Sequence, residues 1–144
     1  MSAINNNIKF LLNLTKTQSI IARRFDGGIG NGLGFNEFLI LLHLNESGQK
    51  MRRVDLAEKI GMTASGVTRI LLPMEKIGLI KNGPVSDDAR VRFVVSSASG
   101  KQKYEEALER LNLLLEDILS GTKEKDVKKL SDLFIGIGGK ILMN

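Results

Sequence analysis

Residues 53–92 decide the fold, and they read RVDLAEKIGMTASGVTRILLPMEKIGLIKNGPVSDDARVR. Apolar residues at helical spacing predict a short helix over 54–60, and Gly61 follows where a left-handed backbone costs glycine little. Thr63 then stands where an N-cap belongs, so a second helix is expected from residue 64 to its end at Gly78. Two short strands joined by a turn come next. The order predicts a helix-turn-helix followed by a β-wing.

The second helix has two contrasting faces. Its expected buried stripe consists of Val67, Ile70, Leu71, Met74 and Ile77. Its other face carries Ala64, Ser65, Thr68 and Arg69. Small and hydroxylic side chains followed by an arginine allow a helix to enter a major groove, because bulky side chains would hold it away from the base edges. We therefore expect these four residues to bind DNA.

The wing is predicted over 79–96. Its first strand begins at Leu79, and residues 81–84 form a turn. In the returning segment, Val91, Phe93 and Val95 alternate with Arg92 and Val94, which predicts a strand with one side buried. Arg90 stands at the base of the loop, and an arginine there suits the narrow, electronegative minor groove. Arg90 and Arg92 are both predicted to bind DNA.

At these residues the sequence resembles the MarR family of bacterial transcriptional regulators. The matching segments are LAEKIG at 56–61, SGVTRIL at 65–71, GLI at 78–80 and DDAR at 87–90. The family pattern ends its wing with Asp-x-Arg, which here is Asp88-Ala89-Arg90. The resemblance extends more loosely over nearly the whole chain.

The resemblance implies one domain over 1–144, mainly α with a small β-wing. In it, a winged-helix core over 35–97 would hold the helix-turn-helix at about 53–77, and helices over 1–25 and 98–144 would form a homodimer. Ser65, Thr68 and Arg69 would then face the major groove and Arg90 the minor groove, with Asp88 holding Arg90 through a charge-assisted hydrogen bond. The family further implies a repressor that responds to a small molecule, bound in a crevice between the dimer helices and the winged helix. No residue identifies that effector, and no other cofactor is expected.

Three residues of the second helix depart from the family pattern. Gly66 stands where a larger polar residue is usual, and glycine weakens a helix interior by roughly 1 kcal/mol relative to alanine. Leu72 and Pro73 stand where charged residues are common. Because Pro73 removes a backbone hydrogen bond, we expect a kink in the second half of this helix.

The positive charge lies mainly on the predicted DNA-binding segment. The chain of 144 residues has a net charge of +5, and residues 50–103 hold eleven Lys and Arg against five Asp and Glu. Phosphate binding requires such a surface, although a merely solvated basic face has the same composition. Cysteine is absent, the first residues do not resemble a secretory signal, and no apolar run would cross a bilayer. We expect a cytoplasmic protein.

The terminal segments carry more apolar residues than a lone winged helix needs. A helix is expected over 3–25, another from a Ser97 N-cap to near Gly121, and a last one capped by Thr122. The second of these has a heptad seam at Tyr104, Leu108, Leu111, Leu115 and Ile118, and the last continues with Val127, Leu130, Phe134, Ile137 and Ile141. The predicted dimerisation residues are Ile4, Ile8, Leu11, Leu115, Ile118, Leu130, Phe134, Ile137 and Ile141. An intramolecular helical hairpin is the alternative.

Between the first helix and the next, at 35–44, lies a glycine-rich stretch at 26–34. It matches neither G-x-G-x-x-G nor the end of a P-loop, so we interpret it as a flexible connector rather than a nucleotide site. The single histidine, His43, has no second histidine or cysteine at ligand spacing, which favours a packed or surface residue over a metal ligand.

These observations favour a homodimeric, sequence-specific DNA-binding transcriptional regulator that recognises a pseudo-palindromic site on double-stranded DNA. The alternative is a winged-helix module that binds protein, which Leu72 and the acidic pair Asp87 and Asp88 support. An enzyme is not expected, because there is no cysteine, one histidine and no paired carboxylate motif in a recognisable context.

Overall fold

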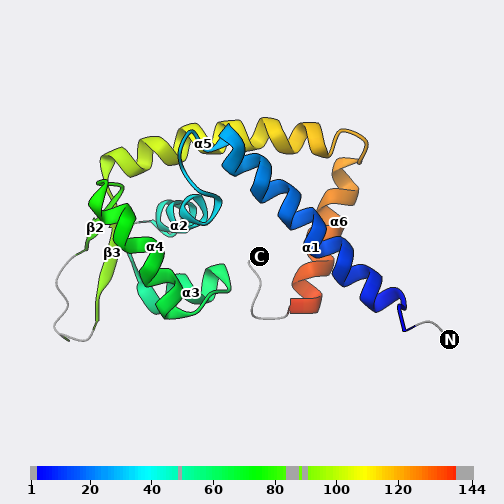
Figure 1. Cartoon of the computed structure of the whole chain (residues 1–144), viewed down its shortest axis with the longest axis horizontal. Coiled ribbons are helices and arrows are strands. Elements are labelled where there is room, and N and C mark those ends of the chain that lie inside the picture. Colours follow the sequence, from blue (N-terminus) through cyan, green and yellow to red (C-terminus); the bar gives the residue numbers. More distant parts are fainter. Residues whose placement is uncertain (1–2, 49, 84–87, 89–90, 139–144) are drawn as a thin grey trace.

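The computed structural model describes residues 3–48, 50–83, 88 and 91–138. In chain order the elements are α1 (Asn6–Arg24), the π-helical turn η1 (Phe25–Ile29), α2 (Phe35–Glu46), β1 (Lys50–Arg52), α3 (Arg53–Ile60), α4 (Ala64–Lys76), β2 (Ile80–Asn82), β3 (Phe93–Ser96), α5 (Ala98–Ile118) and α6 (Glu124–Gly138). The long helix α5 connects two regions (Figure 1). One is a winged-helix core built from α2, α3, α4 and the strands, and the other is an arm in which α1 lies beside α6.

The three strands form one antiparallel sheet in the order β1-β3-β2. Met51 of β1 pairs with Val94 of β3. The buried side of β3 differs from the alternation suggested by the sequence, because Val94 is 2% exposed whereas Phe93 and Val95 are only partly buried. The ring of Phe93 instead faces Lys50, whose Nζ lies 4.4 Å from its centroid.

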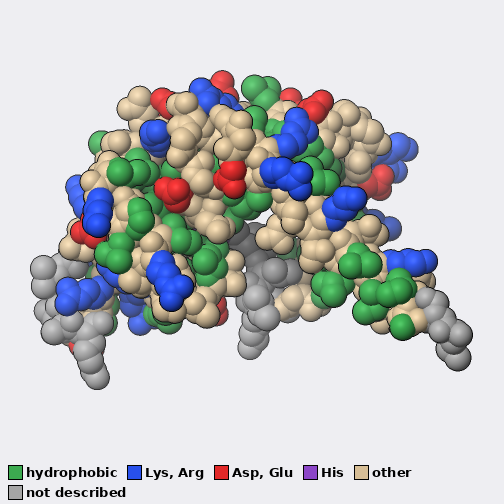
Figure 2. Space-filling view, in the orientation of Figure 1, with side chains coloured by type: hydrophobic (Ala, Val, Ile, Leu, Met, Phe, Trp, Pro, Cys, Tyr) green, Lys and Arg blue, Asp and Glu red, His purple; other side chains and the backbone are tan. Residues whose placement is uncertain are grey.

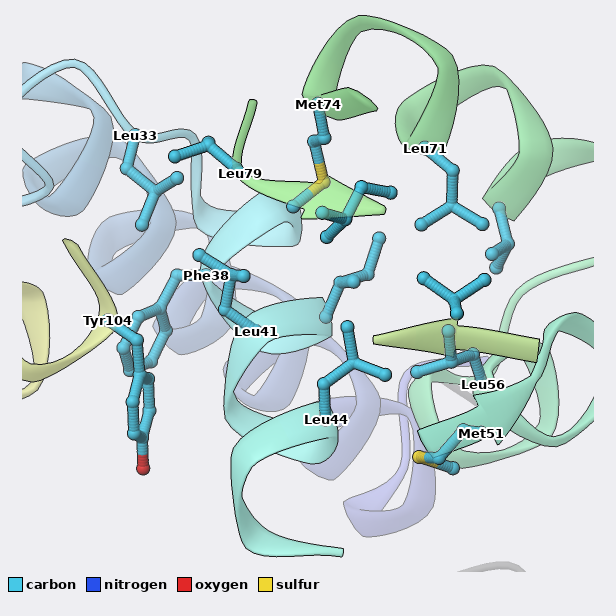
Figure 3. Packing of buried hydrophobic residues seen from close by; sticks show 14 of the residues in the cluster. Leu33, Phe38, Leu41, Leu44, Met51, Leu56, Leu71, Met74, Leu79 and Tyr104 are labelled. Atoms are coloured by element: carbon cyan, nitrogen blue, oxygen red, sulfur yellow. The ribbon is translucent and has the colours of Figure 1, made fainter. Parts of the chain in front are cut away.

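The hydrophobic core lies where α2 meets α3, α4 and the sheet (Figure 3). Phe38 of α2 is fully buried, and its ring centroid lies 5.1 Å from that of Phe25 and 5.8 Å from that of Tyr104. Tyr104 was expected in a seam for dimerisation, but it belongs to this core because the first half of α5 packs on α2. The core therefore contains residues of several elements, from η1 to α5.

Helix α4 buries Val67, Leu71 and Met74 as predicted, but Ile77 is 66% exposed. The helix ends at Lys76, and Gly78 turns the chain away with a φ of 81°. The prediction that Ile77 completes the buried stripe was therefore wrong. The helix continues through Pro73, which lies on its exposed side.

The start of α5 is held by hydrogen bonding and close packing against the segment that leads into β2. The Ser97 hydroxyl accepts a hydrogen bond from the Gly100 N–H at 3.0 Å and donates one to the carbonyl of Gly78, which confirms the predicted N-cap. Gly100 lies so close to β2 that an added Cβ would stand 2.0 Å from the carbonyl oxygen of Leu79. By contrast, the predicted cap at Thr122 was misplaced by one residue, because the Val127 N–H donates to the carbonyl of Lys123.

The glycine-rich stretch is a packed connection rather than an open loop. It begins with η1, in which Gly28 has a φ of 139°. Gly30 is buried, and an added Cβ there would stand 2.6 Å from the Phe25 ring. Lys103 of α5 donates to the carbonyl of Asn31 at 3.2 Å, and Asp26 accepts from the Phe35 N–H at 2.9 Å. These contacts join the end of α1 to the core.

Candidate nucleic-acid interface

The turn between α3 and α4 has the geometry that the sequence predicts. Gly61 adopts the left-handed conformation with a φ of 76°, and its N–H donates to the carbonyl of Ala57 at 2.9 Å. Thr63 caps α4, because its hydroxyl accepts from the Gly66 N–H at 3.0 Å. Two helices fixed in this way hold the exposed face of α4 in a defined direction.

The first turns of α4 present small side chains to solvent. Ala64, Ser65 and Arg69 are exposed, and Thr68 is partly buried. The Thr68 hydroxyl donates to the carbonyl of Ala64 at 3.0 Å, so its proton is already committed within the helix. Its remaining lone pairs and methyl group can still meet a base edge. The structure therefore brings together the four α4 residues that the sequence predicts for the major groove.

The same face continues with two residues that the sequence prediction did not include. Leu72 is 49% exposed, and Lys76 is exposed as well. Both follow Arg69 at helical spacing, and this spacing was the available signal.

The tip of the wing lies outside the described residues. The predicted contact residue Arg90, and with it the hydrogen bond that it is predicted to donate to Asp88, therefore lies outside the described residues. Asp88 is exposed, and its carbonyl accepts from the Val91 N–H at 3.0 Å. Arg92 is exposed next to the start of β3.

The two arginines at the start of α3 are partly engaged within the chain. The Arg52 guanidinium binds both carboxylate oxygens of Asp55, at 2.9 and 3.1 Å, and this hydrogen bonding together with the negative charge raises the pKa of Arg52. The Nε atom of Arg53 is buried and has no hydrogen-bond partner among the described residues. Of the basic residues near α4, Arg69 and Lys76 extend from the exposed face of the helix itself.

A groove of about 740 Å³ opens where α1 and the start of α2 approach α4. Its walls include Gln18 and Ser19 from α1, Phe35 from α2, and Arg69 and Pro73 from α4. Arg69 therefore belongs both to the exposed face of α4 and to the wall of this groove.

His43 is a packed histidine, as the sequence suggested. It is 8% exposed, and burial followed by the positive charge of Lys59 lowers its pKa. Within the described part of the chain, no group of three or more His, Cys, Asp or Glu residues could hold a metal ion. No described helix is both long and apolar enough to cross a membrane.

The predicted dimerisation residues lie mostly on the arm. Ile4, Ile8, Leu11, Leu130 and Ile137 are exposed, Leu115, Ile118 and Phe134 are partly buried, and Ile141 lies outside the described residues. Figure 2 shows hydrophobic side chains gathered on the N-terminal part of α1. An apolar groove of about 460 Å³ separates α1 from α6, where Phe10 and Phe134 have ring centroids 6.1 Å apart.

Comparison with known proteins identifies the winged-helix core. Residues 35–91, from α2 to the wing, match the model of the MarR family. This segment of the chain is therefore similar to the MarR family. A curated relative, the uncharacterised HTH-type transcriptional regulator YdgJ of Bacillus subtilis, is 23% identical over 133 residues, which are 92% of this chain and 79% of the relative.

Solved structures support the same fold over nearly the whole MarR-like chain. The organohalide-sensing regulator RdhR-CbdbA1625, in its 2,4-dichlorophenol-bound form, superposes with a TM-score of 0.83 at 21% identity, covering 96% of this chain and 83% of that one. A mutant of MarR from E. coli, complexed with operator DNA, gives a TM-score of 0.82 at 15% identity, covering 95% and 99%. The expected fold class, mainly α with a small β-wing, is confirmed.

Proposed function

We propose that this protein is a homodimeric, sequence-specific DNA-binding transcriptional regulator that releases its operator when a small molecule binds. The observation that carries the proposal is the exposed face of α4. A capped helix-turn-helix presents small side chains followed by Arg69, within a segment that matches the MarR family. A helix with this face fits a major groove without steric conflict.

In this mechanism, affinity and specificity come from different residues. Lysine and arginine side chains of residues 50–103 bind phosphates, which contributes affinity for any sequence. Ser65, Thr68 and Arg69 read base edges, while Arg90 and Arg92 of the wing read the shape of the minor groove. Asp88 would position Arg90.

The second copy of the chain is proposed to cover the arm. Among the described residues, α1 and α6 contain none that is buried, although both helices are strongly amphipathic. Covering these faces with an identical arm buries them and creates a two-fold axis. The two copies of α4 would then contact half-sites about 34 Å apart in a pseudo-palindromic operator.

The groove beside Arg69 is the proposed effector site. It lies between the arm and the winged-helix core, so an occupant contacts α1, α2 and α4 together. An effector would weaken DNA binding only if it preferred an arrangement of these helices that does not fit the operator. The structure of RdhR-CbdbA1625 with bound 2,4-dichlorophenol supports the binding of a small molecule by a protein of this fold.

The proposal is tested by selecting bound duplexes from a random-sequence pool, followed by salt titration of the enriched site and of an unrelated duplex. Arg69→Ala should lose about 10- to 100-fold in affinity for the enriched site and much less for the unrelated duplex, because a lost base contact removes discrimination. Arg110→Ala, an exposed arginine on α5, is the matched control and should bind like the wild type.

A pool from which no sequence is enriched would contradict the proposal and favour a protein-binding winged helix. Equal losses on both duplexes would restrict Arg69 to phosphate contact. Mass determination in parallel tests the homodimer.

A further inference from the structure

Leu72 occupies an unusual position on α4. Its side chain is 49% exposed, and it lies seven residues after Ser65, three after Arg69 and four before Lys76, all on the exposed face. The residues that face the core, Val67, Leu71 and Met74, lie on the other side of the helix. An exposed leucine is ordinary by itself. This one is a large apolar residue in the middle of a face whose other side chains are small, polar or charged.

The neighbours of Leu72 indicate what covers it. The side chains three or four residues from it on α4 are Thr68, Arg69, Glu75 and Lys76, so none of these neighbours extends it into an apolar patch that would receive a protein surface. Arg69 and Lys76, the two cations, outnumber the single acid Glu75 and favour a polyanion instead. The major groove of DNA offers one apolar group at base edges, which is the C5-methyl group of thymine.

We propose that Leu72 packs against thymine methyl groups in the operator and is a specificity-determining residue of this protein. The proposal rests on the proposed function, in which α4 enters the major groove. Seven residues of helix rise place Leu72 about 10 Å beyond Ser65 along the axis. If α4 lies along the groove, the thymines that contact Leu72 are roughly three base steps from the base nearest Ser65, since bases rise about 3.4 Å per step.

The contact can be tested by removing the methyl group from the DNA. Each thymine of the enriched operator is replaced in turn by deoxyuridine, which lacks only that methyl group, and the dissociation constant of the wild-type protein is measured. At one or two thymines in each half-site, affinity should fall about fourfold per methyl group. Leu72→Ala should bind the unmodified operator several-fold more weakly and should show no further loss at those same positions.

Two variants control the measurement. Ile77→Ala shortens an apolar side chain that is even more exposed, 66% against 49% for Leu72, and that lies at the C-cap of α4 away from this face, so it should keep the wild-type response to deoxyuridine. Leu72→Met keeps an apolar side chain of similar size and should keep most of the response. Because Leu72 is exposed, neither of its substitutions should alter folding measurably.

The proposal is overturned if the wild-type protein tolerates deoxyuridine at every position, or if Leu72→Ala remains as sensitive to it as the wild type. Either result leaves operator binding intact and removes only the role of Leu72. A wild-type protein that selects no sequence at all would instead overturn the proposed function.

Discussion

The winged-helix core and the arm use apolar residues in opposite ways. In the core, Phe38 and Leu41 are 0% exposed, and the chain itself supplies every surface that covers them. In the arm, Leu12 is 54% and Ile137 is 70% exposed. A core can be completed within one chain, whereas the arm leaves its apolar surface to be covered by something else.

Helix α5 belongs to both regions and shows where one ends and the other begins. Tyr104 and Ala107 in its first half are buried in the core cluster, while Leu114 further along is 4% exposed but does not belong to that cluster. One continuous helix thus links the element that faces DNA to the surface that we propose pairs with a second copy. A change of angle in the arm would move α4 without unfolding the core.

The contrast between core and arm predicts that a core substitution has the largest effect. Phe38→Ala removes a fully buried ring that contacts Phe25 and Tyr104, and we expect a loss of about 3–5 kcal/mol in the free energy of unfolding. Chemical denaturation followed by circular dichroism measures it. Phe10→Ala, an arm residue that is 44% exposed, is the matched control and should cost much less at protein concentrations where the assembly is unchanged. Comparable losses for both variants would mean that the arm is as well packed as the core.

An arm substitution should change assembly rather than folding. Leu11→Glu places a charge on the exposed apolar face of α1, so we expect at least a tenfold weaker dimer with helicity retained, because burying an unpaired charge in an interface is costly. Sedimentation or light scattering over a range of concentrations measures the mass.

Ile77→Glu is the control on the core side. Ile77 is 66% exposed, more than Leu11 at 51%, yet it does not belong to the arm. Its variant should assemble like the wild type. If both variants dissociate, exposure alone rather than the arm determines the effect, and if neither does, the arm is not the interface.

The sequence predicted local features of the core well because they depend on neighbouring residues. Gly61, Thr63 and Ser97 each stand where a turn or cap requires that residue type, and all three have the expected geometry. Predictions that depended on tertiary contacts were less successful. The heptad spacing of α5 included Tyr104, but spacing alone cannot tell whether a helix face meets its own core or another chain.

In the candidate site, too, local features were predicted and tertiary contacts were not. Helical spacing placed Ser65 and Arg69 on one exposed face, but it did not reveal that Arg69 also borders a groove, since α1 is distant in sequence. Helical spacing likewise did not predict that the Ile77 side chain would be exposed to solvent. That outcome follows from the end of α4 at Lys76.

The smallest effect is expected where α5 packs on the core. Tyr104 donates a hydrogen bond to a carboxylate oxygen of Glu46 at 2.8 Å. Burial of the ring, this hydrogen bond and the charge of Glu46 raise the pKa of Tyr104 to about 12. We expect Tyr104→Phe to lose about 1 kcal/mol of unfolding free energy at neutral pH.

The raised pKa also fixes the pH at which that contribution disappears. Because the folded protein holds the phenolic proton more tightly than the unfolded chain, whose tyrosine titrates near 10, the stabilisation is complete below pH 10 and is lost as the pH rises to about 12. The stability difference between wild type and Tyr104→Phe should therefore shrink over that interval. Tyr104 is the one tyrosine in the sequence, so tyrosinate absorbance reports its titration directly. Glu46→Gln should lower the pKa without removing the acceptor, and an unchanged titration in that variant would assign the shift to burial alone.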